Sequence, residues 1–195
     1  QVAGTGAQFY SLSAAANPQL QFFENFPGHL GTQFRNMSQA ILSIHAVNIP
    51  LSISFNNVVL LKSNSVTGNT MSVSQSFGLY SLNGSTLSLA NSAGGSYTFS
   101  LTAGATSWHS LATSATQNIT PGTWYFAINQ SSSQGGFAAV FWANSSINPA
   151  NAIPGGFLRG RMTATTNAMP ASIATSDLDI TGIDAIRQPY IIITA

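Results

Sequence analysis

Apolar and polar side chains alternate with a period of two along most of the chain between residues 41 and 142. Successive side chains of a β-strand point to opposite faces, so this pattern predicts half-buried strands. Helical periodicity is hard to find. In the clearest strand, Met71, Val73, Gln75, Phe77 and Leu79 fall on the core face, and Ser72, Ser74, Ser76, Gly78 and Tyr80 fall on the other face.

Turn residues separate the predicted strands. Asn83-Gly84 stands before the alternating Leu87 and Leu89 and predicts a hairpin with a type I′ turn, because both residues tolerate positive φ. Pro121-Gly122 precedes the alternating Trp124, Phe126 and Ile128. Further strands are predicted at Ile41 to Val47, Leu51 to Phe55, Tyr97 to Leu101, Phe137 to Phe141 and Tyr190 to Thr194.

The number and spacing of these strands predict the fold class. About nine or ten short strands in 195 residues indicate one all-β domain, an antiparallel two-sheet β-sandwich that is jelly-roll-like. Residues 1–34 are expected to form an irregular aromatic N-terminal segment. Residues 144–189 are expected to be a loop-rich, charged C-terminal region that opens with a long loop at 144–156.

The charge content is low. Nine side chains are charged, or 5% against a typical value of about 25%, and six of the nine lie between Arg159 and Arg187. The net charge of +1 and a single lysine, Lys62, argue against nucleic acid as a partner. Apolar runs such as Val58 to Leu61 are far shorter than a membrane-spanning helix, so no membrane insertion is expected. A surface of hydroxyls and amides suits a protein that packs against other chains.

The sequence contains few features of a catalytic site, so we expect a protein that is not an enzyme and has no cofactor or metal. The histidines His29, His45 and His109 lie in unrelated contexts, and no Gly-x-Ser-x-Gly motif is present. His45 lies in an apolar strand-like run, which favours a structural residue over a metal ligand. The absence of cysteine removes thiolate nucleophiles and disulfides.

Two interpretations of Asp177 and Asp179 are possible. If they lie in a strand, their spacing puts both carboxylates on one face, where they could serve a hydrolase or bind Ca²⁺. The favoured alternative is that they pair with Arg159, Arg161 or Arg187.

Candidate binding residues lie in three polar stretches. Trp108 and His109 could stack on a sugar and hydrogen-bond to it; the alternative is that Trp108 closes one end of the sandwich. Trp124, in phase with Phe126 and Ile128, belongs to the core instead. The predicted binding residues are Trp108, His109, Ser131, Gln134, Trp142 and Asn144, because loops on a rigid sandwich often carry binding residues.

Three successive stretches suggest a family. "SFGLYSLNGSTLSLANS", "SYTFSLTAGATSWHSLATS" and "ITPGTWYFAINQ" together resemble the C-terminal domains of tail fibres of tailed bacteriophages. The resemblance covers roughly residues 35 to 142 and includes no catalytic signature.

The resemblance implies a β-sandwich at the tip of a fibre, preceded by a shaft, in an extracellular virus particle. It implies a homotrimer that contacts other virion proteins and binds a bacterial surface glycan or outer-membrane protein. It provides no binding residues, because such domains share no fixed receptor motif. A capsid-decorating protein fits the same composition, and a glycan-degrading enzyme that uses Asp177, Asp179 or Asp184 is a third hypothesis.

Overall fold

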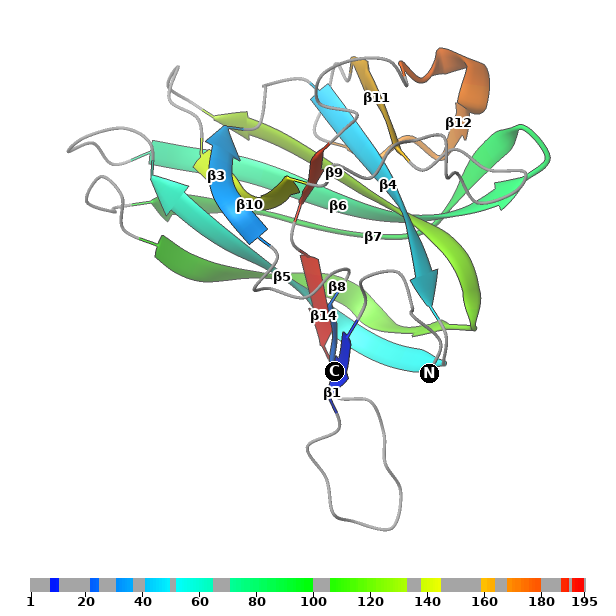
Figure 1. The fold of residues 1–195 in the computed structure, drawn as a ribbon, viewed down its shortest axis with the longest axis horizontal. Helices are drawn as coiled ribbons and strands as arrows, with labels where there is room; N and C mark the ends of the chain where they lie inside the picture. Colours follow the sequence, from blue (N-terminus) through cyan, green and yellow to red (C-terminus); the bar gives the residue numbers. More distant parts are fainter. Residues whose placement is uncertain are drawn as a thin grey trace, which may run out of the picture.

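The protein is built almost entirely of antiparallel β-strands (Figure 1). The computed structural model describes residues 8–10, 22–24, 31–36, 41–49, 52–64, 71–99, 106–132, 138–144, 159–163, 168–179, 187–189 and 191–194. These residues include fourteen strands and one 3₁₀ turn, Thr175–Asp177. No helix in these ranges is long and apolar enough to cross a membrane.

The strands form two sheets. Sheet A contains, in spatial order, β1 (Gln8–Tyr10), β2 (Phe22–Glu24), β14 (Ile191–Thr194), β5 (Ile53–Asn64) and β8 (Thr106–Ile119). At the end of β5 it also contains β10 (Ala138–Asn144), which pairs with β3 (Gly31–Asn36) and β13 (Arg187–Pro189). Sheet B runs β12 (Ser172–Ala174), β7 (Thr86–Phe99), β6 (Met71–Asn83), β9 (Gly122–Ser132), β4 (Ile41–Ile49) and β11 (Arg159–Thr163).

The strand pairing is nested in the manner of a jelly roll. β4 pairs with β9, β5 with β8 and β6 with β7, so the chain from β4 to β9 is one long two-stranded ribbon that folds over on itself. The folding brings β6 beside β9. The predicted antiparallel, jelly-roll-like sandwich is therefore confirmed. The predicted strand number of nine or ten is lower than the fourteen described, because strands of three residues are too short to show alternation and because the polar residues of β8, which carries Trp108 and His109, were interpreted as a loop.

The predicted hairpin after residue 82 is present. Asn83 pairs with Thr86, so the two-residue loop is Gly84-Ser85, one position later than the Asn-Gly pair predicted. Gly84 has φ of 59°, the positive value that both hairpin turn types require at the first loop position. The glycine therefore sets the turn.

A break in the β5–β8 ladder joins the two sheets. Phe55 pairs with Gln117 and Asn57 with Ala112, so residues 113–116 of β8 bulge out of the ladder. At this bulge Thr113 pairs with Ala93 of β7, which belongs to the other sheet. A bulge of this kind lets one strand take part in both sheets and form a corner of the sandwich.

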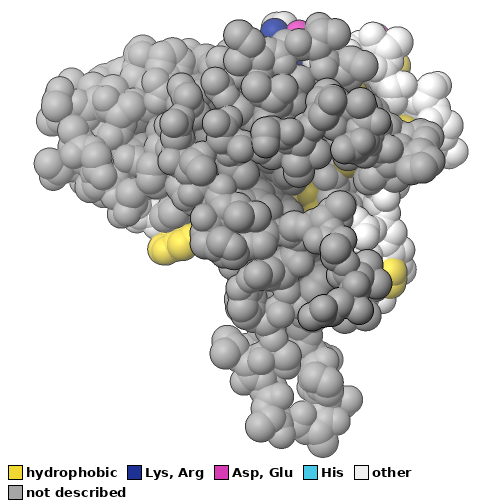
Figure 2. Space-filling view, viewed as in Figure 1, with side chains coloured by type: hydrophobic (Ala, Val, Ile, Leu, Met, Phe, Trp, Pro, Cys, Tyr) yellow, Lys and Arg dark blue, Asp and Glu magenta, His cyan; other side chains and the backbone are white. Residues whose placement is uncertain are grey.

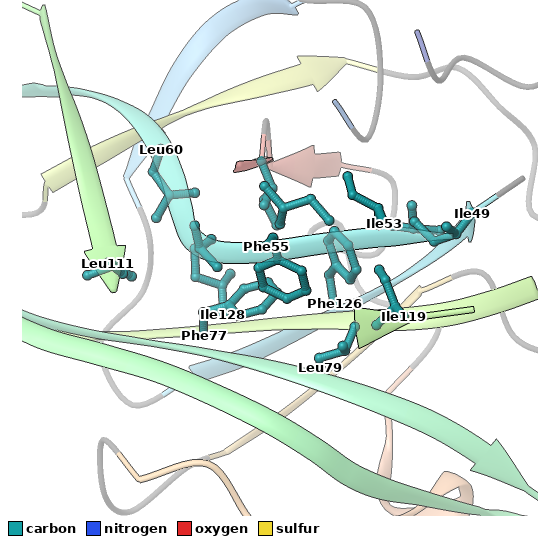
Figure 3. Packing of buried hydrophobic residues seen from close by; sticks show 14 residues of the cluster. Ile49, Ile53, Phe55, Leu60, Phe77, Leu79, Leu111, Ile119, Phe126 and Ile128 are labelled. Carbon is teal, nitrogen blue, oxygen red and sulfur yellow. The ribbon is translucent and has the colours of Figure 1, made fainter. Parts of the chain in front are cut away.

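The main core lies between the sheets (Figure 3). Phe77 and Phe126 meet edge to face, with ring centroids 5.3 Å apart and an interplanar angle of 77°. Trp124 packs against this core in phase with Phe126 and Ile128, as predicted. The buried members are Val47, Ile49, Ile53, Phe55, Val58, Leu60, Phe77, Leu79, Leu111, Ile119, Phe126, Ile128, Ile191 and Ile193.

A second core lies on the opposite face of sheet B. Its buried members are Leu42, Ile44, Tyr80, Leu87, Tyr125, Ala127, Ile173 and Leu178. The prediction that Gly78 and Tyr80 lie on the polar face of a half-buried strand is wrong, because both residues are buried. A Cβ on Gly78 would come within 2.7 Å of the Tyr80 ring and 2.9 Å of the Met169 sulfur, so the close packing there depends on glycine.

Residues 168–179, which we call the cover, close this second core. Within the cover, β12 pairs with β7, and Asp179 pairs with Arg161 of β11 at the opposite edge of sheet B. Five residue steps from Ala174 to Asp179 span at most about 17 Å, whereas a flat sheet of these strands would need about 29 Å. Sheet B must therefore curl, and it forms a half-barrel around the second core, visible in Figure 1 where β4, β11 and β12 approach one another.

Candidate functional site

Trp108 is the large hydrophobic side chain that stands out to solvent among the described residues. It lies near the start of β8 and is 53% exposed. The alternative that Trp108 closes one end of the sandwich is therefore wrong, since a plug would be buried in the core. Leaving this much indole in water has a free-energy cost, and exposed aromatic surface is typical of binding sites.

His109 does not share a surface with Trp108. The two residues are neighbours in a regular part of β8, so their side chains point to opposite faces of sheet A. His109 follows the direction of buried Leu111, and its Nε2 atom has no solvent exposure. The pair therefore cannot act on one ligand as neighbours, although they are adjacent in sequence.

The face of sheet A that carries Trp108 is the one turned away from the main core. On β8 it includes Trp108, Ser110 and Ala112, because these alternate with buried Leu111. The same alternation assigns Asn57 and Val59 of β5 and Ile192 and Thr194 of β14 to this face. These seven residues, which we call the outer face of sheet A, are exposed or partly buried, and none is charged.

Amide and hydroxyl groups form a hydrogen-bonded group that begins two positions along β8 from Trp108. Ser110 Oγ donates to Asn57 Oδ1 at 3.0 Å, and the amide of Asn57 donates in turn to Asn56 Oδ1. Thr113 Oγ1 donates to the Asn56 carbonyl at 3.1 Å. The bulge in the β5–β8 ladder presents Asn56 and Asn57 together. Sequence reasoning missed Asn57 and Ser110; the signal was the break in apolar alternation at Asn56-Asn57.

The other predicted binding residues lie elsewhere. Ser131 is in β9 of sheet B, opposite Ser74 of β6. Trp142 and Asn144 are in β10, opposite Pro189 and Arg187 of β13. β10 and β8 flank the same end of β5 from its two edges, so Trp142, Asn144 and Trp108 share sheet A. Gln134 and most of the predicted loop at 144–156 lie outside the described residues.

The structure supports the favoured alternative for Asp179, which forms an ion pair with an arginine. Asp179 Oδ2 forms an ion pair with Arg161 Nη2 at 2.9 Å, and Arg161 Nε donates to the same oxygen at 2.9 Å. Asp177 lies in the 3₁₀ turn and is exposed, so the premise that both carboxylates share one face of a strand is wrong. No group of three or more potential metal ligands occurs in the described part of the chain.

His45 is a core residue, as predicted. Its side chain is 1% exposed and lies opposite Phe126 in the β4–β9 ladder. Among the described residues, Ser43 and Gln75 are also buried and polar, and they lie on the side of their strands that faces the main core. Because His45, Ser43 and Gln75 are buried, a ligand that approaches from solvent does not contact them.

The described surface is mostly uncharged. In Figure 2, basic and acidic side chains adjoin at the upper edge, and the described surface at the right is largely uncharged. Neither a protein-family profile nor a curated protein sequence matches the chain. The resemblance to tail-fibre domains therefore remains a prediction, and a function can be inferred only from the geometry of the described residues, above all those of sheet A.

Proposed function

We propose that this chain is a non-enzymatic adhesion module of a virus particle, the tip domain of a bacteriophage tail fibre. It binds a receptor on the bacterial surface, works as a homotrimer and contacts other virion proteins. The observation that carries the proposal is the exposed Trp108 on a sheet face whose described positions on β5, β8 and β14 are uncharged, with hydroxyl and amide groups farther along the same strands. Jelly rolls also form viral capsid and lectin domains, which is an analogy of fold alone.

The low charge supports the same function. A ligand held by stacking, hydroxyls and amides keeps its affinity when salt varies, because there is little Coulomb attraction to screen. Solvation of Ser, Thr and Asn maintains solubility. Pairing between chains in a trimer would also cover exposed strand edges, which are otherwise prone to aggregation.

Two measurements test the proposal. Light scattering at two protein concentrations a hundredfold apart should give a constant mass of three chains. The labelled protein should also bind cells of at least one strain in a panel of bacteria, and Trp108→Ala should reduce that binding about tenfold or more. Thr116→Ala, a change at an exposed position of the same strand, is the matched control and should bind as the parent does.

A monomeric mass together with no binding to any strain would contradict the proposal. Binding to phage capsids but not to cells would instead favour a capsid-decorating protein. Release of sugar from cell envelopes, abolished in a folded Asp179→Asn variant, would favour the enzyme hypothesis.

A further inference from the structure

We propose that the receptor bound by the outer face of sheet A is a neutral oligosaccharide, with one pyranose ring stacked on Trp108 and hydroxyls of that ring and the next bound by Ser110 and Asn57. This inference rests on the proposed function and specifies its ligand and its site. Ser110 and Asn57, which were not predicted from the sequence, take the role that the sequence analysis gave to His109, because His109 lies on the other face of β8.

The spacing of the residues suits a sugar. Trp108 and Ser110 are two positions apart on one face of β8, or about 7 Å along the strand. Ser110 is joined by its hydrogen bond to Asn57 on the neighbouring strand. Asn57 lies opposite Ala112, four positions or about 14 Å along β8 from Trp108, so Ser110 is within reach of the ring on the indole and Asn57 is within reach of the next ring of an oligosaccharide.

The hydrogen-bonding capacity also suits a sugar. Ser110 uses its hydrogen on Asn57, and both of its oxygen lone pairs can still accept. The Asn57 amide uses one hydrogen on Asn56 and keeps the other. Each sugar hydroxyl can donate and accept at once, so it matches a site that offers both. The existing bonds also hold the side chains in place, which lowers the entropy lost on binding.

The aromatic and apolar surroundings complete the match. The C–H groups on one face of a pyranose ring are attracted to the negative face of an indole. Val59 and Ile192, both partly buried, extend the apolar surface across β5 and β14. None of the seven residues is charged, and the neighbouring register position on β2, opposite Ile192, is the acidic Glu24, so no basic residue at these positions selects an acidic sugar.

The test is an array of immobilised oligosaccharides, in which neutral hexose and N-acetylhexosamine chains are compared with uronate-containing chains. The full chain should bind at least one neutral class. Raising sodium chloride from about 0.05 M to about 0.5 M should change the affinity less than about twofold, because a charge-driven contact would weaken far more. Trp108→Ala should lower the affinity about tenfold or more, and Trp108→Phe, which keeps an aromatic face, should lower it less.

Ser110→Ala and Asn57→Ala should each lower the affinity about threefold to tenfold, whereas Thr116→Ala should leave it unchanged. The mass in solution should be the same for all variants. If Trp108→Ala changes the mass, the outer face of sheet A is a contact between copies of the chain and the inference is wrong. Binding to bacterial cells without binding to any neutral glycan would also overturn it and would leave the adhesion function standing with a protein receptor.

Discussion

The face of sheet B that is turned away from the main core is covered by the chain itself, whereas the outer face of sheet A carries an exposed tryptophan. On sheet B the cover seals Tyr80, Tyr125 and Leu87 under Ile173 and Leu178. On sheet A, Trp108 is 53% exposed and its strand neighbours on that face are small or polar. The two sheets share one core and differ in what lies on their other faces.

The strands themselves show the origin of this difference. β9 contains the run Tyr125 to Ile128, in which every side chain is apolar, so both of its faces need burial. In β8, Leu111 is buried and its neighbours Ser110 and Ala112 are small and exposed, so one buried face is sufficient. We conclude that the covered face contributes to folding stability, whereas the outer face of sheet A leaves Trp108 in contact with solvent.

The largest expected effect comes from removing apolar contact beneath the cover. Ile173 is 3% exposed and belongs to the second core, so Ile173→Ala should lower the free energy of unfolding by about 2–4 kcal/mol. Trp108→Ala should change it by less than about 1 kcal/mol, since the indole is largely in water. Urea unfolding followed by circular dichroism measures both.

Ser172→Ala, at the exposed neighbour of Ile173, is the matched control and should be within about 0.5 kcal/mol of the parent. Equal costs for Ile173→Ala and Trp108→Ala would mean that the two faces do not differ as described.

A smaller effect is expected at the Tyr80 hydroxyl, which joins the half-barrel to the cover. Tyr80 donates to the Pro170 carbonyl at 2.8 Å, and Tyr80→Phe should cost about 1 kcal/mol at neutral pH. Burial raises the pKa of the Tyr80 phenol well above its ordinary value of about 10. The unfolded chain therefore ionises first, and stability is lost as pH rises above 10.

Measuring urea unfolding at pH 8 and pH 11 checks the direction of this effect. The parent should lose more stability between these values than Tyr80→Phe does, so the difference between the two proteins should shrink at pH 11. Burial also raises the pKa of Tyr125, so the variant should keep part of the decline. An identical decline in both proteins would show that Tyr80 is not held neutral in the folded state.

The sequence predicts the sandwich well because its main core follows simple alternation. Phe77 and Leu79, or Trp124, Phe126 and Ile128, can be assigned to one face by position alone, and the structure places them there. The second core was missed, because alternation assigns Gly78 and Tyr80 to solvent. Only residues some ninety positions later, at Met169 and Pro170, explain why these two are buried.

The candidate site was predicted only in part for a related reason. Trp108 could be chosen because it is aromatic in a polar stretch, but its partner on the same face depends on which strand pairs with β8 and in which register. Asn57 is 53 positions away from Ser110 in sequence, and the register of the β5–β8 ladder makes the two diagonal neighbours. Adjacency in sequence suggested His109 instead, although neighbours in a strand face opposite ways.

The smallest expected effect is at the far end of the cover, where Asp179 meets Arg161. Asn has nearly the same shape as Asp, so Asp179→Asn keeps the two backbone hydrogen bonds between these residues and removes the ion pair. The side chains are 41% and 33% exposed, so water screens their attraction, and the expected loss is at most about 1 kcal/mol. In about 1 M salt, where the screening length is about 3 Å, the loss should fall further.

Asp177→Asn, a change at an exposed residue of the same segment, is the control and should have no effect. A loss of several kcal/mol for Asp179→Asn would mean that charge, rather than the packing of Leu178 and Ile173, holds the cover on sheet B.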